Sequence, residues 1–512
     1  MPEHPLRYPG LRWALYYGEY TGIEQFAVDE LQAFAQYYLP YVIECRPALA
    51  PLNTAPEHQI LVGTPRNNPH LAALIASGRL AGPAGREGFS LAVIPGSKPG
   101  EPKIIAIAGH DPKGVLNGVV DFCARAAGRQ ELCGFTMRDL RQAFDSIGNL
   151  DHRDAAGPGQ NSLGPLVAAA APAIEHRGIW TWGYVISDYR GFLDNMARLK
   201  MNMLVIWNDA PPLNSREIIA HARQRGISMI AGFHWGWGIE KISLTNPDHL
   251  RQVKQQVLDN YELNYKELGF DGIYFQTATE HTELSIDGRT VAGAACDWVN
   301  DIGRALLARH PDLMIQFGLH ATSIMGNYKD LAPLDERIQI IWEDAGVTPY
   351  SYTPKLALPP HLYLSRQGVG TIEGTRDYSV KLASFRGASG FGLCPKGWSN
   401  LDWGNEFEHH QAFIMGRRSP AAIRQRLNEK AAWWNRINQL WLPCYDAQAV
   451  FYREIGSHCT GPITSVGLVE DGMFEARIQP SVAVFAETLW NPDRPTADLV
   501  ELGHSHYYNM TV

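Results

Sequence analysis

The stretch MLVIWNDAPPLNSREIIAHARQRGISMIAGFHW, residues 203–235, decides the fold. It begins with an apolar run at 203–207 and continues with an amphipathic segment from Ser215, which predicts a helix. A second apolar run follows at 227–233. Two short apolar runs joined by a helix are typical of a βαβ unit, whose parallel strands are buried on both faces.

The same unit recurs on both sides of this stretch. We expect strands at 177–186, 203–209, 227–235, 270–277, 313–320, 338–344, 369–374 and 390–395. Eight strands alternating with helices between residues 176 and 401 predict a (β/α)8 TIM barrel, which places the chain in the α/β class. The seventh repeat has the weakest pattern, because four prolines between 349 and 360 disfavour a helix before the seventh strand.

Three further segments flank the predicted barrel. Residues 1–150 alternate strand and helix patterns and predict a small α/β domain, in which Asp111 caps a helix that starts at Pro112. Residues 151–175 are rich in Gly, Ala and Pro, so we expect a linker. Residues 402–512 show mainly helical patterns, so we expect a helical C-terminal region packed on the barrel.

Composition limits the classes of partner. The 512 residues carry a net charge of -8, which gives no reason to expect nucleic acid or a membrane as partner. Seven widely spaced cysteines form no CxxC pair and favour a reduced compartment over a cysteine zinc site. The start MPEHPLRYPG has no apolar core of a signal peptide, so we expect a cytoplasmic protein. The sequence does not decide whether the protein forms a homo-oligomer.

Polar and aromatic residues follow nearly every predicted strand, at the barrel end where TIM barrels place their chemistry. Carboxylates, imidazoles, amides and indoles are the groups that bind and cleave sugars. The residues expected to bind a carbohydrate substrate are Trp182, Trp207, Asn208, Asp209, His234, Trp235, His281, His320, Trp342, Arg376, Lys396 and Trp398.

The carboxylates among these strand ends predict a glycoside hydrolase. One carboxylic acid protonates the leaving oxygen, and a second carboxylate activates water or attacks the sugar. Glu280, which follows the buried run IYF, is the candidate acid, because desolvation would raise its pKa. Glu343, Asp344 and Glu373 are candidates for the second carboxylate. Glu343 and Asp344 are adjacent, so at most one of them faces the site if the strand continues.

Two other functions stay open at this point. The chain could be a carbohydrate-binding barrel without catalysis. It could also be a metal-dependent hydrolase that uses His234, His281 and His320, although the sequence has no HExxH motif. We expect no metal and no cofactor.

The first domain also carries a family resemblance. EGFSLAVIP at 87–95 and KIIAIAGHDPKGVLNGVVDFCARA at 103–126 resemble the N-terminal α/β domain of α-glucuronidases and β-N-acetylhexosaminidases. In those families this domain precedes a catalytic (β/α)8 barrel. Thr279-Glu280 stands where substrate-assisted hexosaminidases carry Asp-Glu, which weakens that assignment.

The α-glucuronidase side of the resemblance implies an exo-acting, inverting enzyme that removes a terminal sugar, such as a uronic acid or an amino sugar. It assigns the acid to Glu280 and the assistance of water to Asp344 and Glu373. A substrate carboxylate would need a cationic partner, for which Arg376 and Lys396 are candidates.

Overall fold

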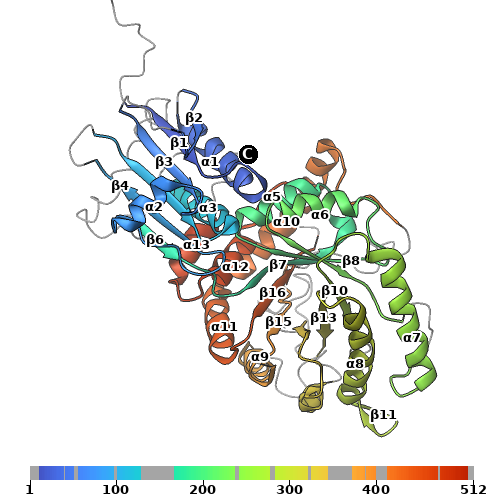
Figure 1. The fold of residues 1–512 in the computed structure, drawn as a ribbon. Helices are drawn as coiled ribbons and strands as arrows, with labels where there is room; N and C mark the ends of the chain where they lie inside the picture. Colours follow the sequence, from blue (N-terminus) through green and yellow to red (C-terminus); the bar gives the residue numbers. More distant parts are fainter. Residues whose placement is uncertain are drawn as a thin grey trace, which may run out of the picture.

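The structure is a computed structural model, and it describes residues 11–39, 41–50, 56–96, 101–128, 167–236, 242–276, 279, 283–320, 324–343, 372–386, 388–398, 412–470 and 473–504. A closed barrel of eight parallel strands carries an α/β domain on one side and helices around it (Figure 1). This confirms the predicted (β/α)8 barrel with an N-terminal α/β domain and a helical C-terminal region.

The barrel strands are short and almost wholly buried, as expected for parallel strands covered on both faces. In order around the barrel they are β7 (His176–Trp182), β8 (Met203–Trp207), β9 (Ser228–Gly232), β10 (Gly272–Gln276), β13 (Met314–Leu319), β14 (Ile338–Trp342), β15 (Phe391–Leu393) and β16 (Ile463–Leu468). β16 pairs with β7 and closes the ring.

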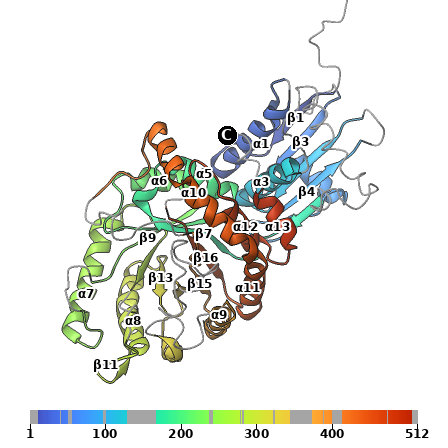
Figure 2. The same cartoon turned by 180° about the vertical axis from the view of Figure 1, so that it is seen from behind.

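Helices surround the barrel (Figure 2). They are α5 (Tyr189–Arg198), α6 (Ser215–Arg223), α7 (Pro247–Asn260), α8 (Val291–Arg309), α9 (Ile372–Arg386), α10 (Pro420–Trp441), α11 (Tyr445–His458), α12 (Pro480–Trp490) and α13 (Thr496–His504). The described residues also form the short elements η2 (Gly183–Val185), η3 (Tyr261–Tyr265), η4 (Met325–Leu331), η6 (Leu442–Cys444), β11 (Ser285–Ile286) and β12 (Arg289–Thr290).

Two predicted barrel strands were wrong. The strand expected at 369–374 does not form, because α9 begins at Ile372. The run at 390–395 is therefore the seventh strand, β15, and not the eighth. The eighth strand is β16, which lies inside the 402–512 segment that we expected to be helical, and it follows β15 only after the long helices α10 and α11.

The N-terminal domain is a six-stranded sheet in the order β2-β1-β3-β5-β4-β6. Its strands are β1 (Trp13–Tyr17), β2 (Glu44–Pro47), β3 (His58–Gly63), β4 (Phe89–Ile94), β5 (Ile104–Gly109) and β6 (Val167–Ala170), and its helices are α1 (Gly22–Tyr38), α2 (Pro69–Ala76) and α3 (Pro112–Gly128). The side chain of Asp111 accepts the N–H of Gly114 and so caps α3, as predicted. β6 pairs with β4, so part of the expected linker belongs to this sheet.

The N-terminal domain contacts the barrel at the amino ends of its strands. Arg177, at the start of β7 and 1% exposed, pairs with Glu87 at 2.5 Å. Trp490 of α12 stacks on Phe89 of β4 with ring centroids 5.8 Å apart. These contacts leave the carboxyl ends of the strands, where the candidate site lies, on the opposite side of the barrel.

No helix within the described residues is long and apolar enough to cross a membrane.

Candidate functional site

Aromatic side chains fill the carboxyl half of the barrel interior. Trp182 of β7 and Trp207 of β8 stand opposite each other in the strand register. Trp180 stacks on Trp207 with centroids 6.0 Å apart, and both rings meet Tyr274 of β10 edge-on. Trp207 keeps 8% of its surface exposed. These rings form an apolar wall on one side of the strand ends, of the kind that packs on sugar faces.

Glu343 directly follows β14, on the side of the barrel away from the aromatic wall, and several polar side chains converge on it. Its side chain points into the barrel and is only 4% exposed. Oxygen Oε1 accepts hydrogen bonds from the hydroxyl of Tyr274 and from Nε2 of Gln276, the latter at 2.5 Å. Oxygen Oε2 lies 2.8 Å from Nε2 of His320 and 3.5 Å from Nζ of Lys396. Four consecutive strands, β10 to β15, therefore converge on one carboxylate.

These contacts fix the charge of Glu343. Burial acts to raise its pKa, but the positive charges of His320 and Lys396, with the hydrogen bonds from His320 and Tyr274, outweigh burial and hold the pKa well below its ordinary value. Glu343 is therefore ionised at neutral pH and cannot serve as the general acid. Burial and the neighbouring Glu343 raise the pKa of Tyr274, which stays a neutral donor.

A second group of polar side chains lies across the ring, on β16, β7 and β8. Tyr184, Asp209 and Glu470 each come two residues after the end of one of these adjacent strands. Glu470 is fully buried and follows the inward-facing Val466 and Leu468 by the strand period of two. Burial, followed by the nearby carboxylates of Asp209 and Glu470, raises the pKa of Tyr184. The carboxyl end of the barrel thus carries at least three carboxylates.

Asn208 and His234 also occupy strand ends. The side-chain oxygen of Asn208 accepts the backbone N–H of Gly183 at 2.8 Å and so joins the end of β8 to that of β7. His234 lies two residues after β9 and is partly buried.

Three indoles that we expected to bind substrate face the opposite way and pack in the core outside the barrel. Trp235 stacks on Phe275 with centroids 3.5 Å apart. Trp342 is fully buried and donates to Ser379 of α9 at 3.1 Å. Trp398 is also fully buried, and it stacks on Trp441 of α10 at 4.5 Å. For Trp342, the last residue of β14, the cause is that neighbouring residues on a strand point to opposite faces, and the composition of a strand end does not give the register.

Arg376 is likewise not among the residues that converge on Glu343. It lies on α9, where its guanidinium pairs with Glu454 of α11 at 3.2 Å. Glu373 falls in the first turn of the same helix and not on a strand as expected. Glu280, His281 and Asp344 lie outside the described residues, so their predicted roles stay predictions.

Tyr274, Gln276 and Glu470 are site residues that the sequence reasoning missed. Tyr274 and Gln276 alternate on one face of a strand whose other residues are apolar, so a polar pair with period two was the available signal. Glu470 follows the apolar run SVGLV, just as Glu343 follows IQIIW. The strand before Glu470 was not recognised, so its carboxylate was not considered.

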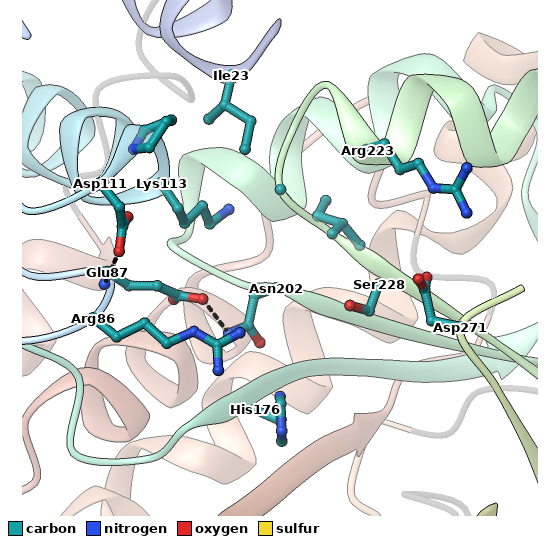
Figure 3. A pocket seen from close by; sticks show the side chains of 13 residues that line it. Ile23, Arg86, Glu87, Asp111, Lys113, His176, Asn202, Arg223, Ser228 and Asp271 are labelled. Atoms are coloured by element: carbon teal, nitrogen blue, oxygen red, sulfur yellow. Dashed lines mark hydrogen bonds between the residues drawn. The ribbon is translucent and has the colours of Figure 1, made fainter. Parts of the chain in front are cut away.

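A cavity of about 350 Å³ lies at the opposite end of the barrel, between the N-terminal domain and the starts of the strands (Figure 3). Charged side chains line it, and two of them, Lys113 and Glu87, hold the two parts together. Nζ of Lys113 donates to the carbonyls of Met201 at 2.9 Å and Arg225 at 2.8 Å. Glu87 accepts from Asn202 at 2.9 Å. We therefore interpret this cavity as part of the domain interface and the carboxyl end of the barrel as the functional site.

Within the described part of the chain, no three His, Cys, Asp or Glu side chains are grouped so that they could hold a metal ion. His320 has Glu343 as its acidic neighbour, and His281 of the proposed histidine set lies outside the described residues.

Comparisons with known proteins add little to this geometry. No family model matches the chain, and no curated protein matches it. Among solved structures, "Structure of CpGH84B" has a TM-score of 0.47 and 11% identity, covering 95% of this chain and 69% of that chain. "Structure of CpGH84D" has a TM-score of 0.40 and 9% identity, covering 97% and 90%. Neither title names an α-glucuronidase, and similarity this low supports no inference about activity.

Proposed function

We propose that the protein is a glycoside hydrolase that removes a terminal sugar at the carboxyl end of its barrel. The observation that carries the proposal is Glu343, a buried carboxylate held ionised by His320 and Lys396 beside a wall of indoles. An ionised carboxylate stabilises the positive charge that develops on the sugar ring as the glycosidic bond breaks. The indoles of Trp182 and Trp207 supply apolar surface for a sugar face.

The finer parts of the proposal rest on the sequence. Glu280 remains the candidate general acid, and the expected course is exo-acting with inversion. The general acid must be a different group from Glu343, because Glu343 holds no proton at neutral pH. Asp209, on the opposite side of the ring and only partly buried, is a described carboxylate that we expect to accept hydrogen bonds from sugar hydroxyls.

The test is turnover of a panel of 4-nitrophenyl glycosides and uronides by the wild type and by Glu343→Gln. We expect the wild type to cleave at least one substrate and the variant to lose about 100-fold or more in kcat/KM, since electrostatic stabilisation of this kind contributes that much. The matched control is Glu267→Gln, an exposed glutamate before β10, which should leave kcat/KM unchanged.

Two results would overturn the proposal. One is a wild type that cleaves no member of the panel. The other is a folded Glu343→Gln variant that retains the wild-type kcat/KM. Sugar binding by the wild type without turnover would instead support the alternative of a carbohydrate-binding barrel that lacks catalysis.

A further inference from the structure

The side chain of Gln276 crosses one strand of the barrel to reach Glu343. Gln276 ends β10, whereas Glu343 follows β14, and β13 runs between these two strands. The residue opposite Gln276 on β13 is Gly318. A Cβ atom at Gly318 would overlap the hydroxyl of Tyr274 and Oε1 of Glu343. The missing side chain therefore leaves the space in which Tyr274 and Gln276 reach across β13 to the carboxylate.

The contact with Glu343 fixes the direction in which the amide of Gln276 points. Nε2 of Gln276 lies 2.5 Å from Oε1 of Glu343, which is ionised at neutral pH because its pKa is low. An ionised carboxylate only accepts hydrogen bonds, and an amide donates through its nitrogen alone. A flipped amide would place two acceptors against each other. The nitrogen must therefore face Glu343, and the amide oxygen of Gln276 faces away from it.

Gln276 lies where the interior of the barrel opens. Tyr274, two residues earlier on the same face of β10, is fully buried, whereas Gln276 is only partly buried. In the part of the chain that the structure describes, no group donates a hydrogen bond to the amide oxygen of Gln276. The site therefore presents a hydrogen-bond acceptor of fixed direction beside Glu343.

The aromatic wall determines where a sugar would meet this oxygen. Trp207 contacts Tyr274 edge-on, with ring centroids 6.0 Å apart. Gln276 follows Tyr274 by one strand period, about 6.6 Å further along β10. A sugar whose face packs on Trp207 would therefore lie beside the amide of Gln276.

We infer that Gln276 is a specificity-determining residue of the proposed glycoside hydrolase, and that its amide oxygen accepts a hydrogen bond from a hydroxyl or an amide N–H of the sugar. The inference rests on the proposed function and deepens it by naming the chemistry of one substituent. A sugar with a carboxylate at this position has no hydrogen to donate, and its charge would lie beside the anionic Glu343. An analogue without the donor leaves the acceptor unpaired and should bind about 10- to 100-fold more weakly.

The direction of this hydrogen bond can be tested on the wild type alone. Calorimetry compares the monosaccharide that binds most tightly with its deoxy and deoxyfluoro analogues, changed at one position at a time; for an N-acylated sugar the O-acyl analogue is added. Fluorine does not donate a hydrogen bond, so at the position that meets Gln276 both analogues should lose about 10- to 100-fold in affinity. If no position is found at which removal of the donor weakens binding, the inference is overturned.

A mutant cycle separates recognition by Gln276 from a structural role. Gln276→Met keeps the length of the side chain but removes both polar atoms. It should weaken binding of the parent sugar by about 10- to 100-fold and leave the affinity for the one matching analogue unchanged, because that analogue has nothing to donate. Gln252→Met, at an exposed glutamine of α7, is the control and should bind every sugar as the wild type does. Equal losses for the parent sugar and all analogues would overturn the inference, since Gln276 would then only support Glu343.

These binding measurements do not depend on turnover, so the inference and the proposed function can fail separately. If the wild type cleaves no glycoside but the cycle shows coupling at one position, the role of Gln276 in recognition stands without catalysis. If the wild type cleaves a glycoside but Gln276→Met weakens binding uniformly, the proposed function stands without the inference. A wild type that binds no sugar overturns both. If Gln276→Met does not fold, the deoxyfluoro series on the wild type decides alone.

Discussion

Replacing Glu343 with glutamine should destabilise the barrel. The change keeps the size of the side chain but removes a charge that lies 2.8 Å from His320 and 3.5 Å from Lys396. Lys396 is 7% exposed, so its ammonium would stay buried after losing the negative charge of Glu343. Removing one partner of a buried ion pair costs about 3–5 kcal/mol, and we expect a loss of that order in the free energy of unfolding at pH 7.

The assay is equilibrium unfolding in urea at several pH values. The folded-state pKa of Glu343 lies below its ordinary value of 4.5, so its stabilising effect is present above that value and is lost as the pH falls through the folded-state pKa. The difference between wild type and variant should therefore shrink below about pH 4. Adding Lys396→Met should recover part of the loss, because the buried cation that lost the negative charge of Glu343 is then gone.

The control is again Glu267→Gln. Because this residue is on the surface, we expect its substitution to change the free energy of unfolding by no more than about 0.5 kcal/mol. If Glu343→Gln changed the unfolding free energy no more than this control, Glu343 would not be the buried, doubly paired anion described above. If the double variant lost as much unfolding free energy as the two single variants together, the side chains of Lys396 and Glu343 would not be coupled.

Three further predictions concern the domain interface and the aromatic wall. Burial lowers the pKa of Lys113 to about 7, so between pH 7 and 10.5 the unfolded chain binds more protons than the folded chain. The free energy of unfolding should therefore rise with pH in this range, by up to about 1.4 kcal/mol per pH unit. Urea unfolding should show a smaller rise for Lys113→Met than for the wild type. Arg177→Met removes the cation that pairs with the buried Glu87, so the interface should weaken by about 3–5 kcal/mol and limited proteolysis should release the N-terminal domain faster. Trp207→Ala should weaken sugar binding roughly tenfold, measured by calorimetry in the Glu343→Gln background.

Most of the barrel could be predicted because buried parallel strands are apolar runs that end in polar residues. The barrel strands β7, β8, β9, β10, β13 and β14 follow this rule, and their predicted ranges contain the observed strands almost entirely. The rule failed at the eighth strand, where two long helices replace the single helix of the earlier repeats. β16 carries the buried polar residues Thr464 and Ser465 and follows two long helices, so neither its composition nor its spacing resembled the earlier strands.

The candidate site could be predicted only in part. Glu343 and His320 were found because each ends a strand, but their contact depends on neighbouring strands that lie 18 residues apart in the chain. The inward or outward direction of a ring could not be predicted, since a shift of one residue reverses it. For that reason Trp182 and Trp207 lie inside the barrel while Trp342 packs outside it.

The central claim is that a sugar binds at the carboxyl end of the barrel. It is tested most directly by soaking crystals of the protein with a panel of monosaccharides and uronic acids. We predict density for a bound sugar beside Trp207, within reach of His320 and Asp209. Sugar bound only in the cavity between Lys113 and Arg223, at the amino end of the barrel, would contradict the claim.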